Sequence, residues 1–204
     1  MSSTNPVTFM ITIPHATCVK TDLETGRHTC DILAPVAADW LMAALAARGA
    51  AVFDMPGNTN RGVEPDLNRR ASRGSRYRKD VSEATTSSER PIFVIDVHSF
   101  DEKARWGVTE AGKVPTIVLL DGQQRPSATD AIPERLKDIL TPGYQEYVQV
   151  GGSPENDIVV AAKEDGAIGA VLIEFSEAEF DTDEKLMDVS AELANALMML
   201  ARNM

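Results

Sequence analysis

Two of the three histidines in this chain stand at the ends of apolar segments that are typical of buried strands. His15 follows the segment 7–13 and one proline, and His98 lies near the end of another such run. Because ligands gather at the carboxyl ends of strands in open α/β folds, we expect both imidazoles at one edge of a sheet. Imidazole is a common zinc ligand, so the pair indicates a metal site. The alternative for each histidine is a hydrogen-bonded polar side chain without a metal.

A hydrolytic zinc site needs a third protein ligand and one position for water. The residues after His15 offer five candidates: Cys18, Asp22, Glu24, His28 and Asp31. We favour Asp31 because it stands at the start of a predicted helix, which is a rigid position. Its alternative role is to cap that helix. Cys18 is the main rival as the third ligand.

Two carboxylates in apolar segments could support such a metal. Asp96 lies two residues before His98, so both side chains project from the same face of a strand, and Asp96 could orient the imidazole. A buried aspartate without a chemical role fits equally well. Glu174 interrupts an apolar run, where an unpaired charge is costly. We expect it to be a general base, and a structural salt bridge is its alternative.

Residues 61–79 form a positive segment in a chain of net charge −11. Its cations are Arg61, Arg69, Arg70, Arg73, Arg76, Arg78 and Lys79. Only Glu64 and Asp66 oppose them. Since arginine binds carboxylates bidentately, the segment indicates a small anionic substrate. A solvated basic loop is the alternative.

The periodicity of apolar residues along the chain places these residues in one α/β domain. Strands are predicted at 7–13, 50–55, 91–98, 114–120 and 168–175, and helices at about 31–48, 133–140, 154–164 and 183–202. The segment 57–90 has no clean period and is predicted to be a long loop, either functional or disordered. The alternation of strands and helices indicates a single domain, residues 1–204, with a mixed, mostly parallel sheet flanked by helices.

Composition narrows the function. The acidic balance disfavours a general binder of nucleic acid or of an anionic membrane. No run approaches the roughly 18 apolar residues that span a bilayer, and the N-terminal residues do not resemble a signal peptide, so we expect a cytoplasmic protein. Two cysteines are too few for a disulfide scaffold. The sequence lacks the motifs of serine hydrolases and of phosphate-binding NTPases.

Four short motifs occur in the order found in the N-formylglutamate amidohydrolase family. They are Pro14-His15, Asp66-Leu-Asn68-Arg69, Asp96-Val-His98-Ser99 and Leu172-Ile-Glu174. From about residue 10 to 200 the chain resembles that family, which is itself similar to the zinc carboxypeptidases and to succinylglutamate desuccinylase. The resemblance implies a zinc-carboxypeptidase-like (phosphorylase/hydrolase-like) fold. It also implies a zinc-dependent amidohydrolase that acts on a small N-acyl amino acid such as N-formylglutamate.

The resemblance also implies residue roles. Zinc would bind His15, His98 and, as the best match for a carboxylate ligand, Asp31, with Glu174 as the general base. Zinc carboxypeptidases carry a glutamate three residues after the first histidine, and this chain has Cys18 there.

On the substrate side, Asn68 and Arg69 would hold an α-carboxylate, and Arg61 would stabilise the oxyanion. Arg73 and Arg76 could meet a second carboxylate. Two other functions stay open. One is a metallocarboxypeptidase or peptidoglycan peptide hydrolase, and the other is a non-catalytic anion-binding relative of the same fold.

Overall fold

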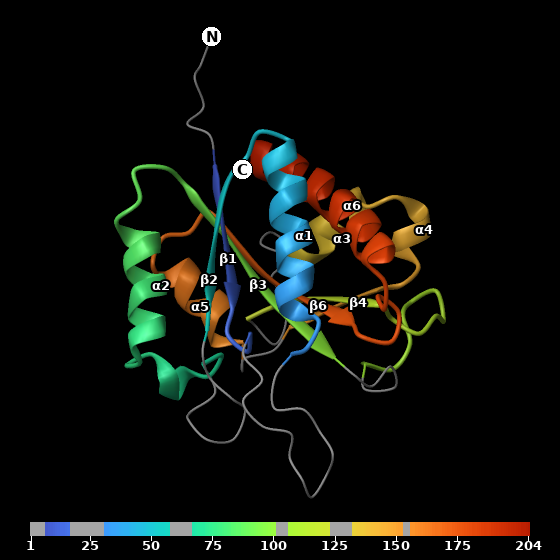
Figure 1. Cartoon of the computed structure of the whole chain (residues 1–204), viewed down its shortest axis with the longest axis horizontal. Helices are drawn as coiled ribbons and strands as arrows, with labels where there is room; N and C mark the ends of the chain where they lie inside the picture. The colour runs from blue at the N-terminus through green and yellow to red at the C-terminus, as the bar shows by residue number, and fades with distance from the viewer. Residues whose placement is uncertain (1–6, 17–30, 58–66, 101–105, 123–131, 153–155) are drawn as a thin grey trace, which may run out of the picture.

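A mixed sheet runs through the middle of the computed structural model (Figure 1), which describes residues 7–16, 31–57, 67–100, 106–122, 132–152 and 156–204. The strands, in spatial order, are β2 (Ala51–Pro56), β1 (Thr8–Ile13), β3 (Ile92–Phe100), β6 (Gly169–Ser176), β4 (Ile117–Asp121) and β5 (Val148–Gly152). The first four are parallel, whereas β4 runs antiparallel to β6 and parallel to β5. The predicted mixed, mostly parallel α/β sheet is confirmed.

Helices cover both faces of this sheet (Figure 1). One face carries α1 (Ala34–Ala47), α3 (Ile132–Ile139) and α6 (Asp183–Arg202), with the short α4 (Pro142–Gln145) beside them. The other face carries α2 (Arg76–Thr86) and α5 (Asp157–Glu164), and a 3-10 turn, Arg70–Ser72, precedes α2. Among the described residues, no helix has the length and apolar character needed to cross a bilayer.

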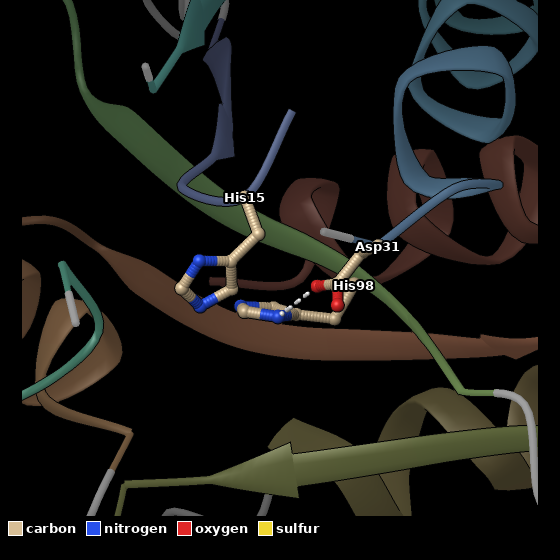
Figure 2. Close-up of side chains that lie close together, drawn as sticks. All are labelled: His15, Asp31 and His98. Atoms are coloured by element: carbon tan, nitrogen blue, oxygen red, sulfur yellow. Dashed lines mark hydrogen bonds and ion pairs between the residues drawn. The ribbon is translucent and has the colours of Figure 1, made fainter. Parts of the chain in front are cut away.

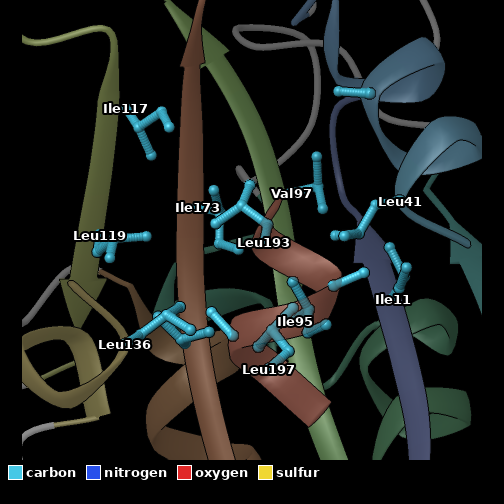
Figure 3. Close-up of a cluster of buried hydrophobic side chains, with 14 of the residues drawn as sticks. Ile11, Leu41, Ile95, Val97, Ile117, Leu119, Leu136, Ile173, Leu193 and Leu197 are labelled. Carbon is cyan, nitrogen blue, oxygen red and sulfur yellow. The ribbon is translucent and has the colours of Figure 1, made fainter. Parts of the chain in front are cut away.

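Strand alternation decides which side chains enter which layer. All nine residues of β3 are buried. Ile95 and Val97 pack in the cluster beneath α1 and α6 (Figure 3), whereas Ile92 and Val94 pack in the cluster against α2 and α5. The even-numbered positions of β3 therefore face α2 and α5.

The structure differs from the sequence-based expectation in the segment 57–90. Its second half is not a loop, because α2 occupies Arg76–Thr86. Only Arg78, Val81 and Thr85 of α2 are buried, and two of these are polar, so the apolar period that marks a helix is absent. Strand β5 was not predicted either, since it is a half-buried edge strand that ends in two glycines.

Candidate metal centre

Three buried side chains meet at the carboxyl ends of the parallel strands (Figure 2). His15 follows β1, His98 belongs to β3, and Asp31 lies three residues before α1. Their exposed fractions are 2%, 3% and 1%. One ligand atom from each residue lies within 4.8 Å of the others, and the two imidazole ring centroids are 5.2 Å apart. The structure thus brings together the three residues that the sequence analysis favoured as metal ligands.

The carboxylate of Asp31 is directed at His98. Its Oδ2 lies 2.7 Å from Nδ1 of His98. The backbone N–H of Asp31 donates to the carbonyl oxygen of His15 at 3.2 Å, which ties the two ligand segments together. Leu33, and not Asp31, occupies the N-cap position of α1, so Asp31 is not the capping residue of this helix and its side chain contacts His98 instead.

The second nitrogen of His98 has supporting partners. Oδ2 of Asp96 lies 3.2 Å from Nε2, and Nδ2 of Asn68 lies at the same distance. The other carboxylate oxygen of Asp96 accepts a hydrogen bond from the Thr12 hydroxyl at 2.6 Å. Carboxylates in this position fix the orientation of a metal-binding imidazole. Thr12 was not singled out from the sequence, although a lone hydroxyl on the same face of a buried strand as Met10 was a signal for it.

The two carboxylates change the protonation of His98. Burial by itself lowers the pKa of this imidazole, because the charged form loses hydration. The charge of Asp96 and the hydrogen bond that the ring donates to Asp31 outweigh burial and raise the pKa of His98 well above its ordinary value of 6.5. A metal ion that binds a nitrogen of the His98 imidazole must therefore displace a proton from it.

Glu174 lies on the strand next to His98. The two residues are paired in register across β3 and β6, so their side chains project from the same face of the sheet. Neighbouring strands of a sheet lie about 4.8 Å apart. Glu174 is 8% exposed. The carboxylate expected to act as the general base thus belongs to the same sheet edge as the candidate metal ligands.

Asn68 is held by contacts within the chain. Besides its contact with His98, its Oδ1 accepts the backbone N–H of Ile158 at 3.3 Å, and its carbonyl oxygen accepts that of Asp157 at 3.0 Å. The amide therefore joins the first turn of α5 to the metal group. These partners lie far away in the sequence, which is why the motif alone did not reveal them.

Among the described cations of the positive segment, Arg73, Arg76 and Arg78 contact acidic residues of this chain. Arg73 donates to both carboxylate oxygens of Asp157, at 2.7 and 2.8 Å, and to Glu164 at 2.7 Å. Arg78 is buried and donates to Asp157 at 2.8 Å. The Arg76 side chain is 95% exposed and lies 3.8 Å from Asp80.

The remaining candidates divide into two groups. Arg69 lies at the surface, directly before the 3-10 turn. Cys18, Asp22, Glu24, His28 and Arg61 lie outside the described residues.

Comparisons with known proteins establish the fold. No family model and no curated protein matches the chain. A gene product of Agrobacterium tumefaciens has the same fold, with a TM-score of 0.63 and 18% identity over 96% of this chain and 90% of that chain. An N-acetylmuramoyl-L-alanine amidase from Clostridium difficile gives a TM-score of 0.57 and 15% identity over 97% of this chain and 98% of that chain. An N-formylglutamate amidohydrolase from Ralstonia eutropha gives a TM-score of only 0.49 and 14% identity over 96% of this chain and 93% of that chain.

The chain thus has an α/β fold that it shares with a solved amidase structure. At such low identity a common fold does not carry a common activity, so the function has to be argued from the site.

Proposed function

We propose that this chain is a zinc-dependent amide hydrolase. The observation that carries the proposal is the buried group of His15, Asp31 and His98 at the carboxyl ends of parallel strands. Two imidazoles and one carboxylate are a ligand set of catalytic zinc sites, with a fourth position for water. Tetrahedral zinc holds its ligand atoms roughly 3.4 Å apart. Small side-chain adjustments bring atoms that already lie within 4.8 Å to that spacing.

The residues around this group have complementary roles in the proposed reaction. Zinc at the site would supply a water of lowered pKa and would polarise the scissile carbonyl. Glu174 accepts the proton of the attacking water and then donates it to the leaving amine. Asp96 holds His98 in its ligand orientation through Nε2. Arg61 is our candidate for stabilising the oxyanion.

A small N-acyl amino acid of the N-formylglutamate type is the first candidate substrate. The order of the four sequence motifs supports it. Arg69 is exposed and is our candidate to bind the α-carboxylate, next to Asn68. Arg73 is left out of the proposed site, because Asp157 and Glu164 already engage it. Arg76 is left out because its side chain projects into solvent from α2.

The amide bond of an N-acetylmuramoyl peptide is a second candidate. Two observations favour it. The fold matches an N-acetylmuramoyl-L-alanine amidase over nearly the full length of both chains. The ion pairs of Arg73 with Asp157 and Glu164 also reduce the positive charge that a small dianionic substrate would need.

The test measures metal content and hydrolysis on the same protein. We expect about one zinc per chain, and hydrolysis of one of the two amides that stops on chelation and returns with zinc. Glu174→Gln should keep the zinc and lose about 10²–10⁴-fold in rate, whereas the exposed Glu184→Gln should change neither. A chain that binds no metal contradicts the proposal. A zinc-loaded chain that cleaves neither amide favours the non-catalytic alternative.

A further inference from the structure

A side chain on β3 holds the start of α1. Ser99 is 2% exposed, and its Oγ accepts the backbone N–H of Leu33 at 3.2 Å. The first N–H groups of a helix have no partner within the helix, and the N-cap residue Leu33 has no side chain that could accept them. The hydroxyl of Ser99, 66 residues further along the chain, accepts one of these groups, the N–H of Leu33 itself.

The held segment is the one that carries the carboxylate ligand. Asp31 lies two residues before Leu33, and its carbonyl oxygen accepts the N–H of Ala34 at 3.2 Å. Its own N–H donates to the carbonyl of His15. The short stretch 31–34 is thus tied to His15 on one side and to Ser99 on the other.

Glu177 sets the direction of the Ser99 hydroxyl. Ser99 donates its single proton to Oε1 of Glu177 at 2.6 Å, a distance typical of a charge-assisted hydrogen bond. Because a hydroxyl has one proton and two lone pairs, this bond leaves a lone pair for the Leu33 N–H. The backbone N–H of Glu177 donates to the carbonyl of Phe100 at 3.0 Å, which fixes Glu177 to the end of β3.

We propose that Ser99 and Glu177 are positioning residues that set where Asp31 stands relative to His15 and His98. Consecutive residues of β3 then serve one site from opposite faces. His98 points to the α2 and α5 side as a ligand, and Ser99 points to the α1 side and fixes the segment of the next ligand. The inference rests on the proposed metal-binding function.

The test compares Ser99→Ala with Ser99→Thr and with the control Ser176→Ala. Ser176 is fully buried at the end of β6, and its hydroxyl has no hydrogen-bond partner among the described residues. For Ser99→Ala we expect about tenfold weaker zinc affinity, an altered absorption spectrum of bound Co²⁺, and faster amide hydrogen exchange over residues 31–34. Ser99→Thr should restore all three readouts, and Ser176→Ala should change none. Glu177→Ala should reproduce the Ser99→Ala effects.

Two results overturn the positioning role alone. One is wild-type affinity and wild-type exchange in Ser99→Ala, and the other is an equal loss in Ser99→Ala and Ser176→Ala without rescue by threonine. A wild-type chain that binds neither zinc nor Co²⁺ overturns the proposed metal site together with this inference. The exchange measurement needs no metal, so the two failures can be told apart.

Discussion

The imidazole of His98 is held at both nitrogens. Asp31 contacts Nδ1 and Asp96 contacts Nε2. We expect Nδ1 to bind the metal, because it is the nitrogen that lies beside Asp31, while Asp96 retains the proton on Nε2. The two aspartates that touch one ring then differ in role, one as a ligand and one as an orienting partner.

Replacing Asp96 should weaken the metal site without removing a ligand. We expect Asp96→Asn to lower zinc affinity by about 10–100-fold, because the imidazole loses the carboxylate that orients it and raises its basicity. Competition with a chromogenic chelator measures the change. Asp54→Asn, on the exposed side of β2, is the control and should bind zinc like the wild type. Equal affinities of Asp96→Asn and wild type would contradict the orienting role.

Metal affinity should rise with pH. The two carboxylates raise the pKa of His98, so the metal-free ring stays doubly protonated, as the imidazolium, to a higher pH than an ordinary histidine does. Below that raised pKa each pH unit should strengthen binding by about tenfold, and the dependence should level off above it. Calorimetry in buffers of different ionisation enthalpy should show about one proton released per metal at pH 7. A pH-independent affinity above pH 7 would count against this protonation state.

The sequence was sufficient for the two histidines, because a polar residue at the end of an apolar run is visible without coordinates. It was less informative about Asp31, which was one of five candidates in a single stretch. The choice depends on a contact with His98, 67 residues away. The sequence likewise did not show the partners of Arg73, since Asp157 and Glu164 approach it only in the folded chain.

At the scale of elements, one aspartate joins α2, α5 and the metal group. Asp157 binds Arg73 from the turn before α2 and Arg78 from α2 itself. Arg78 also donates to the carbonyl of Leu67 at 2.9 Å, next to the Asn68 that contacts His98. Burial alone raises the pKa of Asp157, but hydrogen bonds from the two arginines outweigh it and lower the pKa below its ordinary value of 3.8.

Breaking this link should destabilise the fold. Asp157→Asn leaves the buried guanidinium of Arg78 without its carboxylate, so we expect a loss of about 3–5 kcal/mol in the free energy of unfolding. Glu164→Gln removes the exposed partner of Arg73 and should cost less than about 1 kcal/mol. Urea denaturation measures both variants. If the two variants lost similar amounts of unfolding free energy, the buried ion pair would contribute no more to stability than the exposed one, against this prediction.

The same comparison has a defined pH dependence. A carboxylate with a lowered pKa contributes stability above its ordinary pKa of 3.8, and this contribution is lost as pH falls through the lowered value. The difference between wild type and Asp157→Asn should therefore be constant near neutral pH and shrink in strong acid.

Elements with a strong apolar period were predictable, and those without one were not. The predicted helix 183–202 matches α6, whose buried leucines and valine recur at helical spacing. Helix α2 was missed because ion pairs to α5, not apolar packing alone, hold it. The local pattern of apolar residues thus predicted the central layers. Elements held by polar partners far away in the sequence became visible only in the folded chain.

At the scale of the whole molecule, the three ligands come from segments that meet only in the native fold. Zinc should therefore stabilise the chain against unfolding, by about 2.7 kcal/mol at a free concentration 100 times the Kd. For a chain of this length we expect a rise in Tm of about 5–10 °C. Thermal scans with zinc and with a chelator measure it. His15→Ala should show no such rise, and a zinc-induced rise of equal size in that variant would contradict the assigned ligand.

The alternation of side chains along β3 limits which insertions and deletions the gene can tolerate. His98 and Ser99 work only because they point to opposite faces, and β3 is buried over its full length. Gaining one codon upstream of Asp96 within this strand would turn the imidazole into the apolar layer beneath α1 and bring Val97 to the site, and losing one would bring Ser99 there. A substitution in β3 changes one of these side chains at a time, whereas such a length change displaces ligand, orienting carboxylate and hydroxyl in a single event.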